Sequence, residues 1–139
     1  AKAGVDPLLL LSLMRRESRF VVAARSRTGA LGLFQIMPYT ARELEPTSAD
    51  TPAGEGLLAA PASADLAARL VKRIQARFDS AVAPVVASYN AGEDRVSDWW
   101  KAATGLPEDL FVDSIPYAET RQYVREVLAN YETYRRLYR

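Results

Sequence analysis

Cysteine and histidine are both absent from this sequence of 139 residues. Their absence excludes disulfides, a thiolate nucleophile, a Ser-His-Asp triad and the usual kinds of zinc site. Proton transfer near neutral pH must therefore be carried out by a carboxylate, a lysine or a tyrosine. Because a chain without cysteine is compatible with any compartment, this absence does not locate the protein.

An excess of charge of either sign is also missing. The chain has 18 basic and 17 acidic side chains, which leaves a net charge of +1. Nucleic-acid-binding domains usually carry a strong basic excess, so this class of function is not indicated. The hydrophobic fraction of 49% and the charged fraction of 25% are ordinary for a folded protein. The length suits one compact domain, and we expect a single domain over residues 1–139.

Long apolar segments are missing too. No run reaches the roughly 20 apolar residues that cross a bilayer. The N-terminus lacks the basic flank and small-residue cleavage site of a signal peptide. The opening "AKAGVDP" is typical of a mature or excised domain, and an upstream leader or domain remains an open alternative.

Helical patterns dominate what is present, because no stretch alternates in the β manner for more than a few residues. Asp6 followed by Pro7 is a typical N-cap and first helical residue, and Ser63 is expected to cap a later helix. The sequence predicts an all-α protein of six to eight helices with a surface loop at 46–56. The expected helices cover about 7–19, 38–45, 63–78, 81–92, 93–104, 107–111 and 116–137.

Glu17 has an unusual position at the end of the apolar run "PLLLLSLM". Helix residues three, four and seven positions apart share a face, so Glu17 lies on the face of Leu10, Leu13 and Met14. If this face meets the core, Glu17 is at least half-buried, and desolvation raises its pKa. A carboxyl group that stays protonated near neutral pH can donate a proton to a leaving oxygen. The alternative is that Glu17 turns to solvent or pairs with a neighbouring arginine.

A glycine-containing loop follows this helix. Gly29 and Gly32 either let the backbone approach another molecule or are ordinary turn residues. Gln35 interrupts the apolar run "LGLFQIMP". Because a buried amide needs hydrogen-bond partners, Gln35 either faces a ligand or bridges backbone groups.

Polar and aromatic residues mark two later helix ends. Tyr89 and Asn90 interrupt a small-residue helix near its terminal glycine, and Glu119 lies in the first turn of the last helix. An ordinary helix end and the helix dipole explain these positions equally well. Trp99 and Trp100 are either half core and half surface or a platform for a sugar.

Four segments occur together in one order. They are "ESRF" at 17–20, "SRTGALGLFQIMPYTA" at 26–41, "ASYNAGEDRV" at 87–96 and "IPYAETRQYV" at 115–124. This combination resembles the catalytic domain of the soluble lytic transglycosylases. The resemblance implies an all-α, goose-type lysozyme-like fold with a substrate groove and cleavage of the glycan strands of bacterial peptidoglycan.

The same resemblance implies roles by position. Glu17 matches the catalytic acid and base of the family. The substrate-binding residues that it implies are Ser26, Gln35, Met37, Tyr89, Asn90 and Glu119. We expect no cofactor and no metal, and peptidoglycan glycan strands are the expected partner. The substrate implies the periplasm or cell envelope as the place of action.

The family's reaction needs one carboxyl group, whereas most glycosidases use two. Glu17 would protonate the glycosidic oxygen between N-acetylmuramic acid (MurNAc) and N-acetylglucosamine (GlcNAc), with the 2-acetamido group stabilising the anomeric carbon. The Glu17 anion would then take the proton of the 6-hydroxyl of the same MurNAc. That hydroxyl attacks the anomeric carbon, and a 1,6-anhydro product forms without water.

The sequence departs from the family pattern in two places. Phe34 stands where the family usually has methionine, which keeps an apolar wall. The family's Asn-Ile, Gly and Tyr-Leu positions before "YNAG" are Ser63-Ala64, Ala67 and Leu70-Val71 here. The alternatives are a true hydrolase of goose-type lysozyme character, a glycan-binding module without catalysis, and a plain helical interaction domain.

Overall fold

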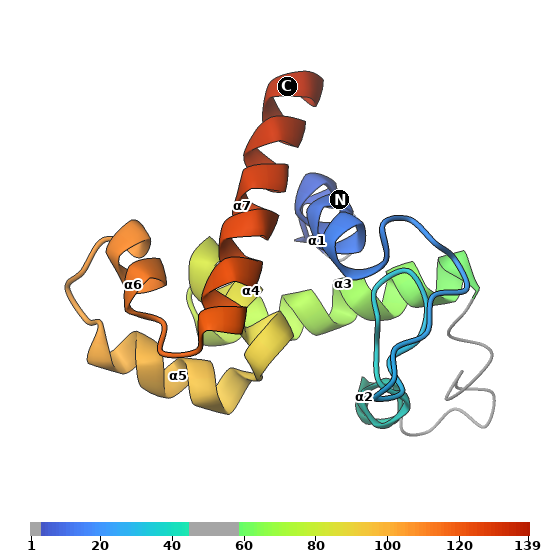
Figure 1. Ribbon diagram of the computed structural model, residues 1–139, viewed down its shortest axis with the longest axis horizontal. Helices are drawn as coiled ribbons and strands as arrows, with labels where there is room; N and C mark the ends of the chain where they lie inside the picture. The colour runs from blue at the N-terminus through green and yellow to red at the C-terminus, as the bar shows by residue number, and fades with distance from the viewer. Residues whose placement is uncertain (1–3, 45–58) are drawn as a thin grey trace. The chain divides into compact units, whose positions relative to one another are not determined.

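The computed structural model describes residues 4–44 and 59–139, which form seven α-helices and contain no β-strand (Figure 1). The predicted all-α class and the predicted number of helices are confirmed for this part of the chain. The expected loop at 46–56 lies outside the described residues. The chain forms two compact units, Ala1–Leu70 and Val71–Arg139.

The first unit begins with α1 (Pro7–Ser18), whose start is set by local capping as predicted. The Asp6 carboxylate accepts a hydrogen bond from the Leu8 N–H at 2.9 Å, and Pro7 occupies the first helical position. The helix ends when Arg19 takes the left-handed conformation with φ of 51° and donates its N–H to the Arg15 carbonyl. Helix α1 therefore ends one residue earlier than the sequence predicted.

A loop of residues 19–37 leads from α1 to the short helix α2 (Pro38–Leu44). Isolated antiparallel bridges join Arg25 to Leu31 and Leu31 to Ile36. Gly29 and Gly32 have φ of 100° and 82°, which confirms the prediction of a tight turn. The loop also contributes four buried apolar side chains: Leu31, Leu33, Phe34 and Ile36.

Helix α3 (Ala60–Arg77) begins three residues before the predicted start, so the prediction that Ser63 caps it is wrong. Pro61 is accommodated as the second residue of the first turn, where no intrahelical N–H bond is lost. The Ser63 N–H instead donates to the Ala59 carbonyl at 3.0 Å, and its side chain is fully buried. Along α3 and at the residue after it, the side chains of Leu66, Val71, Ile74 and Phe78 are buried, whereas Leu70 is half-buried.

The second unit is organised around α4, which is buried along most of its length. The elements that follow the end of α3 are α4 (Val82–Ala91), α5 (Glu93–Ala102), α6 (Glu108–Ser114) and α7 (Ala118–Tyr138). Helix α4 packs against α5, α6 and α7, and Pro84 lies in its first turn, where a proline costs no intrahelical hydrogen bond. Its composition explains this position, because small apolar residues let three neighbours approach closely.

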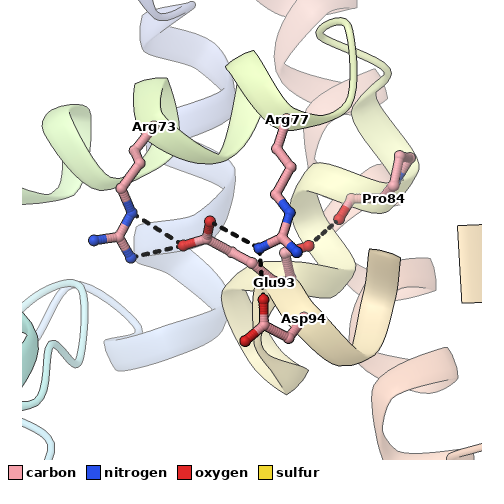
Figure 2. Close-up of polar contacts among 6 residues, drawn as sticks. Arg73, Arg77, Pro84, Glu93 and Asp94 are labelled. Atoms are coloured by element: carbon pink, nitrogen blue, oxygen red, sulfur yellow. Dashed lines mark hydrogen bonds and ion pairs between the residues drawn. The ribbon is translucent and has the colours of Figure 1, made fainter. Parts of the chain in front are cut away.

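A group of four charged residues connects the end of α3 to the start of α5 (Figure 2). Arg73 donates from Nε and Nη2 to one Glu93 oxygen at 3.0 and 2.6 Å. Arg77 Nη1 lies 3.7 Å from the other Glu93 oxygen and 2.8 Å from an Asp94 oxygen. Both acids lie in the first turn of α5, where the helix dipole favours negative charge. The turn between α4 and α5 is thereby held against α3.

In the part of the chain that the structure describes, no helix has the length and apolar character needed to cross a membrane.

Candidate active site

Glu17 lies in the last turn of α1 and is half-buried. Its neighbours on the same face are Leu13, which is only 1% exposed, and the half-buried Leu10 and Met14. The predicted partial burial of Glu17 on an apolar face is therefore confirmed. Burial of this degree removes part of the water around the side chain, and loss of water disfavours a carboxylate anion.

Ser18 fixes the backbone directly after Glu17. Its hydroxyl donates to the Met14 carbonyl at 3.1 Å and accepts the Phe20 N–H at 3.2 Å. The second bond stabilises a turn in which Phe20 has a positive φ of 67°. The end of α1 is thus a defined turn, which is the kind of support that a reacting side chain needs.

Ser26 is exposed and organises the first half of the 19–37 loop. Its hydroxyl accepts the Ala30 N–H at 2.9 Å and lies 3.0 Å from the Thr28 hydroxyl. Its own N–H donates to the Ala30 carbonyl at 3.0 Å. Ser26 therefore closes a five-residue turn on the protein surface.

Gln35 bridges backbone groups within the same loop. Its side-chain nitrogen donates to the Ala24 carbonyl at 3.1 Å and to the Gly32 carbonyl at 2.8 Å. Its backbone has a positive φ of 50°, which is uncommon for this residue type. Of the two predictions for Gln35, the structure confirms the bridging one. The nitrogen is committed to the loop, which leaves the amide oxygen as the atom that could meet a ligand.

Met37 is half-buried and closes the loop at the start of α2. A Cβ atom placed on Gly29 would lie 3.6 Å from the Met37 methyl carbon, so the two residues are in close contact. Ser26, Gln35 and Met37 therefore belong to one hydrogen-bonded and packed loop.

Tyr89 and Asn90 lie in the last turn of α4, and Asn90 connects it to α7. The Thr120 hydroxyl donates to the Asn90 side-chain oxygen at 2.8 Å. Gly92, with φ of 95°, ends α4 by donating its N–H to the Ser88 carbonyl at 2.9 Å. The bond between Thr120 and Asn90 joins the third and fourth sequence motifs across a separation of 30 residues.

The first turn of α7 has one side chain in solvent and others that bond to the protein. Glu119 is exposed, whereas Thr120 is 2% exposed. Arg121 donates from Nη1 to the Ile115 carbonyl at 2.7 Å and so fixes the chain before the helix. Sequence reasoning missed Thr120 and Arg121. Thr120 could have been found from the sequence, because a threonine on the buried face of a helix needs a hydrogen-bond partner for its hydroxyl.

The two tryptophans have different surroundings. Trp100 packs edge-on against the fully buried Phe111 at 5.0 Å between ring centres. Trp99 packs edge-on against the exposed Tyr117 at 5.1 Å, and the Arg95 guanidinium lies 5.0 Å from the Tyr117 ring centre. This arrangement favours the prediction that the pair is half core and half surface.

The structure thus brings the predicted site residues together in two groups. The loop after Glu17 carries Ser26, Gln35 and Met37 in the first unit. Tyr89, Asn90 and Glu119 lie at adjoining helix ends in the second unit. Among residues 4–44 and 59–139, no group of three or more acidic side chains is arranged to hold a metal ion.

The fold and these motif residues define an all-α protein of the lysozyme-like class. The sequence profile described as "Transglycosylase SLT domain" matches residues 1–112. The chain therefore belongs to the transglycosylase SLT domain family.

Individual relatives agree with this family. The soluble lytic murein transglycosylase of Salmonella typhimurium is 35% identical over 129 residues, which cover 91% of this chain and 20% of that protein. The solved structure of an inactive mutant of lytic transglycosylase Slt from Pseudomonas aeruginosa is similar, with a TM-score of 0.87 and 33% identity. The match covers 96% of this chain and 22% of the Slt chain. A 70-kDa soluble lytic transglycosylase in complex with bulgecin A gives 0.89 at 30% identity, with the same coverage of 96% and 22%. The chain thus spans about a fifth of the length of each of these three relatives.

Proposed function

We propose that this chain is the catalytic domain of a peptidoglycan lytic transglycosylase, extending over residues 1–139. It cleaves the MurNAc-β-1,4-GlcNAc bond of glycan strands without water and leaves a 1,6-anhydro-MurNAc end. The observation that carries the proposal is the half-buried Glu17 on the apolar face of α1, in a chain of the transglycosylase SLT domain family. Its site of action is the periplasm or cell envelope, where the substrate is.

Glu17 acts first as an acid. Its protonated carboxyl group donates to the glycosidic oxygen as the bond between that oxygen and the anomeric carbon of MurNAc breaks. The departing GlcNAc keeps the proton as a hydroxyl, and the 2-acetamido oxygen of MurNAc stabilises the cationic carbon. Partial burial of Glu17 supports this step, because a desolvated carboxyl group retains its proton to a higher pH.

Glu17 acts second as a base. Its carboxylate takes the proton of the MurNAc 6-hydroxyl while that oxygen bonds to the anomeric carbon and displaces the acetamido oxygen. The carboxyl group is protonated again at the end, so the cycle consumes neither water nor a cofactor. One residue suffices because acid and base act in succession.

The remaining motif residues bind the glycan in this proposal. Gln35 contributes its amide oxygen, since its nitrogen is committed to the backbone. Asn90 contributes its amide nitrogen, since its oxygen accepts from Thr120. Glu119 contributes an exposed carboxylate. Three further residues complete the proposed substrate-binding set: Ser26, Met37 and Tyr89.

The mass of the products tests this function. Purified sacculi are digested with the protein, and the soluble muropeptides are analysed by mass spectrometry before and after borohydride reduction. A transglycosylase yields products that lack one water relative to lysozyme products and that resist reduction. Reducible ends would establish a hydrolase instead, and intact sacculi would favour a glycan-binding module. As an independent probe, bulgecin A is expected to bind this chain as it does the 70-kDa transglycosylase.

A further inference from the structure

The bond between Thr120 and Asn90 is a direct side-chain contact between the last turn of α4 and the first turn of α7. The donor is the Thr120 hydroxyl and the acceptor is the Asn90 amide oxygen, at 2.8 Å. The two residues differ in exposure, because Thr120 is 2% exposed whereas Asn90 is exposed. A buried hydroxyl therefore holds one end of a surface amide.

In this structure the Asn90 amide has its oxygen toward the Thr120 hydroxyl, which acts as the donor. The terminal torsion of asparagine has two broad minima that exchange the oxygen and the nitrogen. A donor placed against the oxygen favours one of them, and the nitrogen with its two protons is then directed away from Thr120. The exposed part of Asn90 is consequently a hydrogen-bond donor, which suits a sugar hydroxyl or an acetamido carbonyl.

Polar contacts hold the chain on both sides of this pair. Arg121 ties the chain before α7 to the Ile115 carbonyl at 2.7 Å. The turn after Asn90 is held by the paired bonds from Arg73 to Glu93 shown in Figure 2. Each helix end is therefore held by a bond of its own, separate from the bond between Thr120 and Asn90, so removal of the Thr120 hydroxyl should change the Asn90 amide more than the backbone around it.

We propose that Thr120 is a positioning residue that fixes the Asn90 amide so that its nitrogen donates to the glycan. This inference rests on the proposed function, since it assigns Thr120 a task in substrate binding. Thr120 itself touches no substrate. Within residues 119–121, Glu119 is exposed to solvent, whereas Thr120 and Arg121 bond to neighbouring parts of the protein.

The first test is kinetic and uses the full chain with a soluble glycan strand of defined length. Thr120→Val keeps the shape of the side chain but removes the hydroxyl. We expect KM to rise about five- to tenfold with kcat within about twofold of wild type, because a ground-state contact is weakened. Thr120→Ser restores the hydroxyl and should recover most of the affinity. Thr133→Val makes the same chemical change at an exposed position of α7 and should leave KM unchanged.

A double-mutant cycle separates positioning from general weakening. If Thr120 acts through Asn90, Thr120→Val should add nothing to the effect of Asn90→Ala. Equal effects of Thr120→Val with and without Asn90 would overturn the inference. A fall in kcat with unchanged KM would overturn it as well.

The second test needs no activity. The side-chain amide of Asn90 gives a pair of resonances in a ¹H–¹⁵N NMR spectrum, assigned from their loss in Asn90→Ala. We expect these resonances to shift and broaden in Thr120→Val, to stay in place in Thr133→Val and to return in Thr120→Ser. An unchanged Asn90 pair in Thr120→Val would refute the positioning role. Wild-type protein that leaves glycan uncut while the NMR prediction holds would refute the proposed function but not the orientation of Asn90.

Discussion

Arg73 places two of its nitrogens against one oxygen of Glu93, at 3.0 and 2.6 Å. The Glu93 side chain is only 19% exposed, and Arg77 approaches its second oxygen at 3.7 Å. Glu93 follows Gly92, the residue at which α4 ends. The ion pair therefore ties the turn that ends the "YNAG" segment to Arg73 on α3.

Glu93→Gln should lower the free energy of unfolding. The change removes the charge that two arginines share at the start of a helix, and we expect a loss of about 1–2 kcal/mol in denaturant unfolding. Glu132→Gln is the matched control, because that glutamate is 56% exposed and pairs with Arg136 on the same helix at 3.3 Å. The control should change stability by less than about 0.5 kcal/mol. Equal losses in the two variants would show that the Arg73 pair is no stronger than a surface ion pair.

Glu17→Gln should keep the fold and lose nearly all turnover. An amide of the same shape cannot donate the proton that the leaving oxygen needs. The rate of solubilisation of sacculi gives the activity, and circular dichroism confirms the fold. Glu43→Gln, an exposed acid on α2, makes the same change of charge in the same unit and should retain activity. More than about a tenth of wild-type activity in Glu17→Gln would contradict the assignment.

The pKa of Glu17 is expected to lie above the ordinary value for glutamate of about 4.3. Partial burial beside Leu13 should penalise the anion, and we therefore expect a raised pKa. With a raised pKa the folded protein would bind this proton more tightly than the unfolded chain, so Glu17 should contribute stability at low pH that is lost as pH rises through its folded pKa. NMR titration with a carboxyl label measures it, using Glu17→Gln for assignment. A pKa near 4 would contradict desolvation on the apolar face.

Local signals explain what could be predicted from the sequence. The start of α1 depends on Asp6 and Pro7, which act on backbone groups within three residues. The burial of Glu17 followed from helix periodicity, which relates residues no more than seven positions apart. Each of these inferences needs only the geometry of one helix.

Contacts between distant residues explain what could not be predicted. Gln35 reaches a carbonyl eleven residues earlier, and it does so from a positive φ that no local pattern indicates. Asn90 and Thr120 are thirty positions apart and meet because α4 packs against α7. Ser63 failed as a cap for a different reason, since Pro61 fits inside the first turn and the helix starts earlier. Partners of this kind depend on packing, which periodicity alone does not specify.

Gln35→Met should loosen the loop that carries Ser26 and Met37. The substitution preserves most of the volume but removes both hydrogen bonds, so the Ala24 and Gly32 carbonyls lose a side-chain donor. We expect a loss of about 1–3 kcal/mol in stability. Amide hydrogen exchange should accelerate most at Gly32, whose own N–H donates to the Ala24 carbonyl at 2.9 Å.

The matched control for this change is Gln122→Met on α7. Gln122 is exposed, and its side chain donates to Glu126 on the same helix at 3.2 Å, so its replacement should leave the exchange of the 19–37 loop unaltered. In the proposed enzyme, Gln35→Met should also reduce the cleavage of sacculi, because the groove residues of the loop depend on the two bonds. Normal exchange at Gly32 together with normal stability would show that Gln35 is dispensable for the loop. Its place in the motif would then have to be explained by substrate contact through the amide oxygen alone.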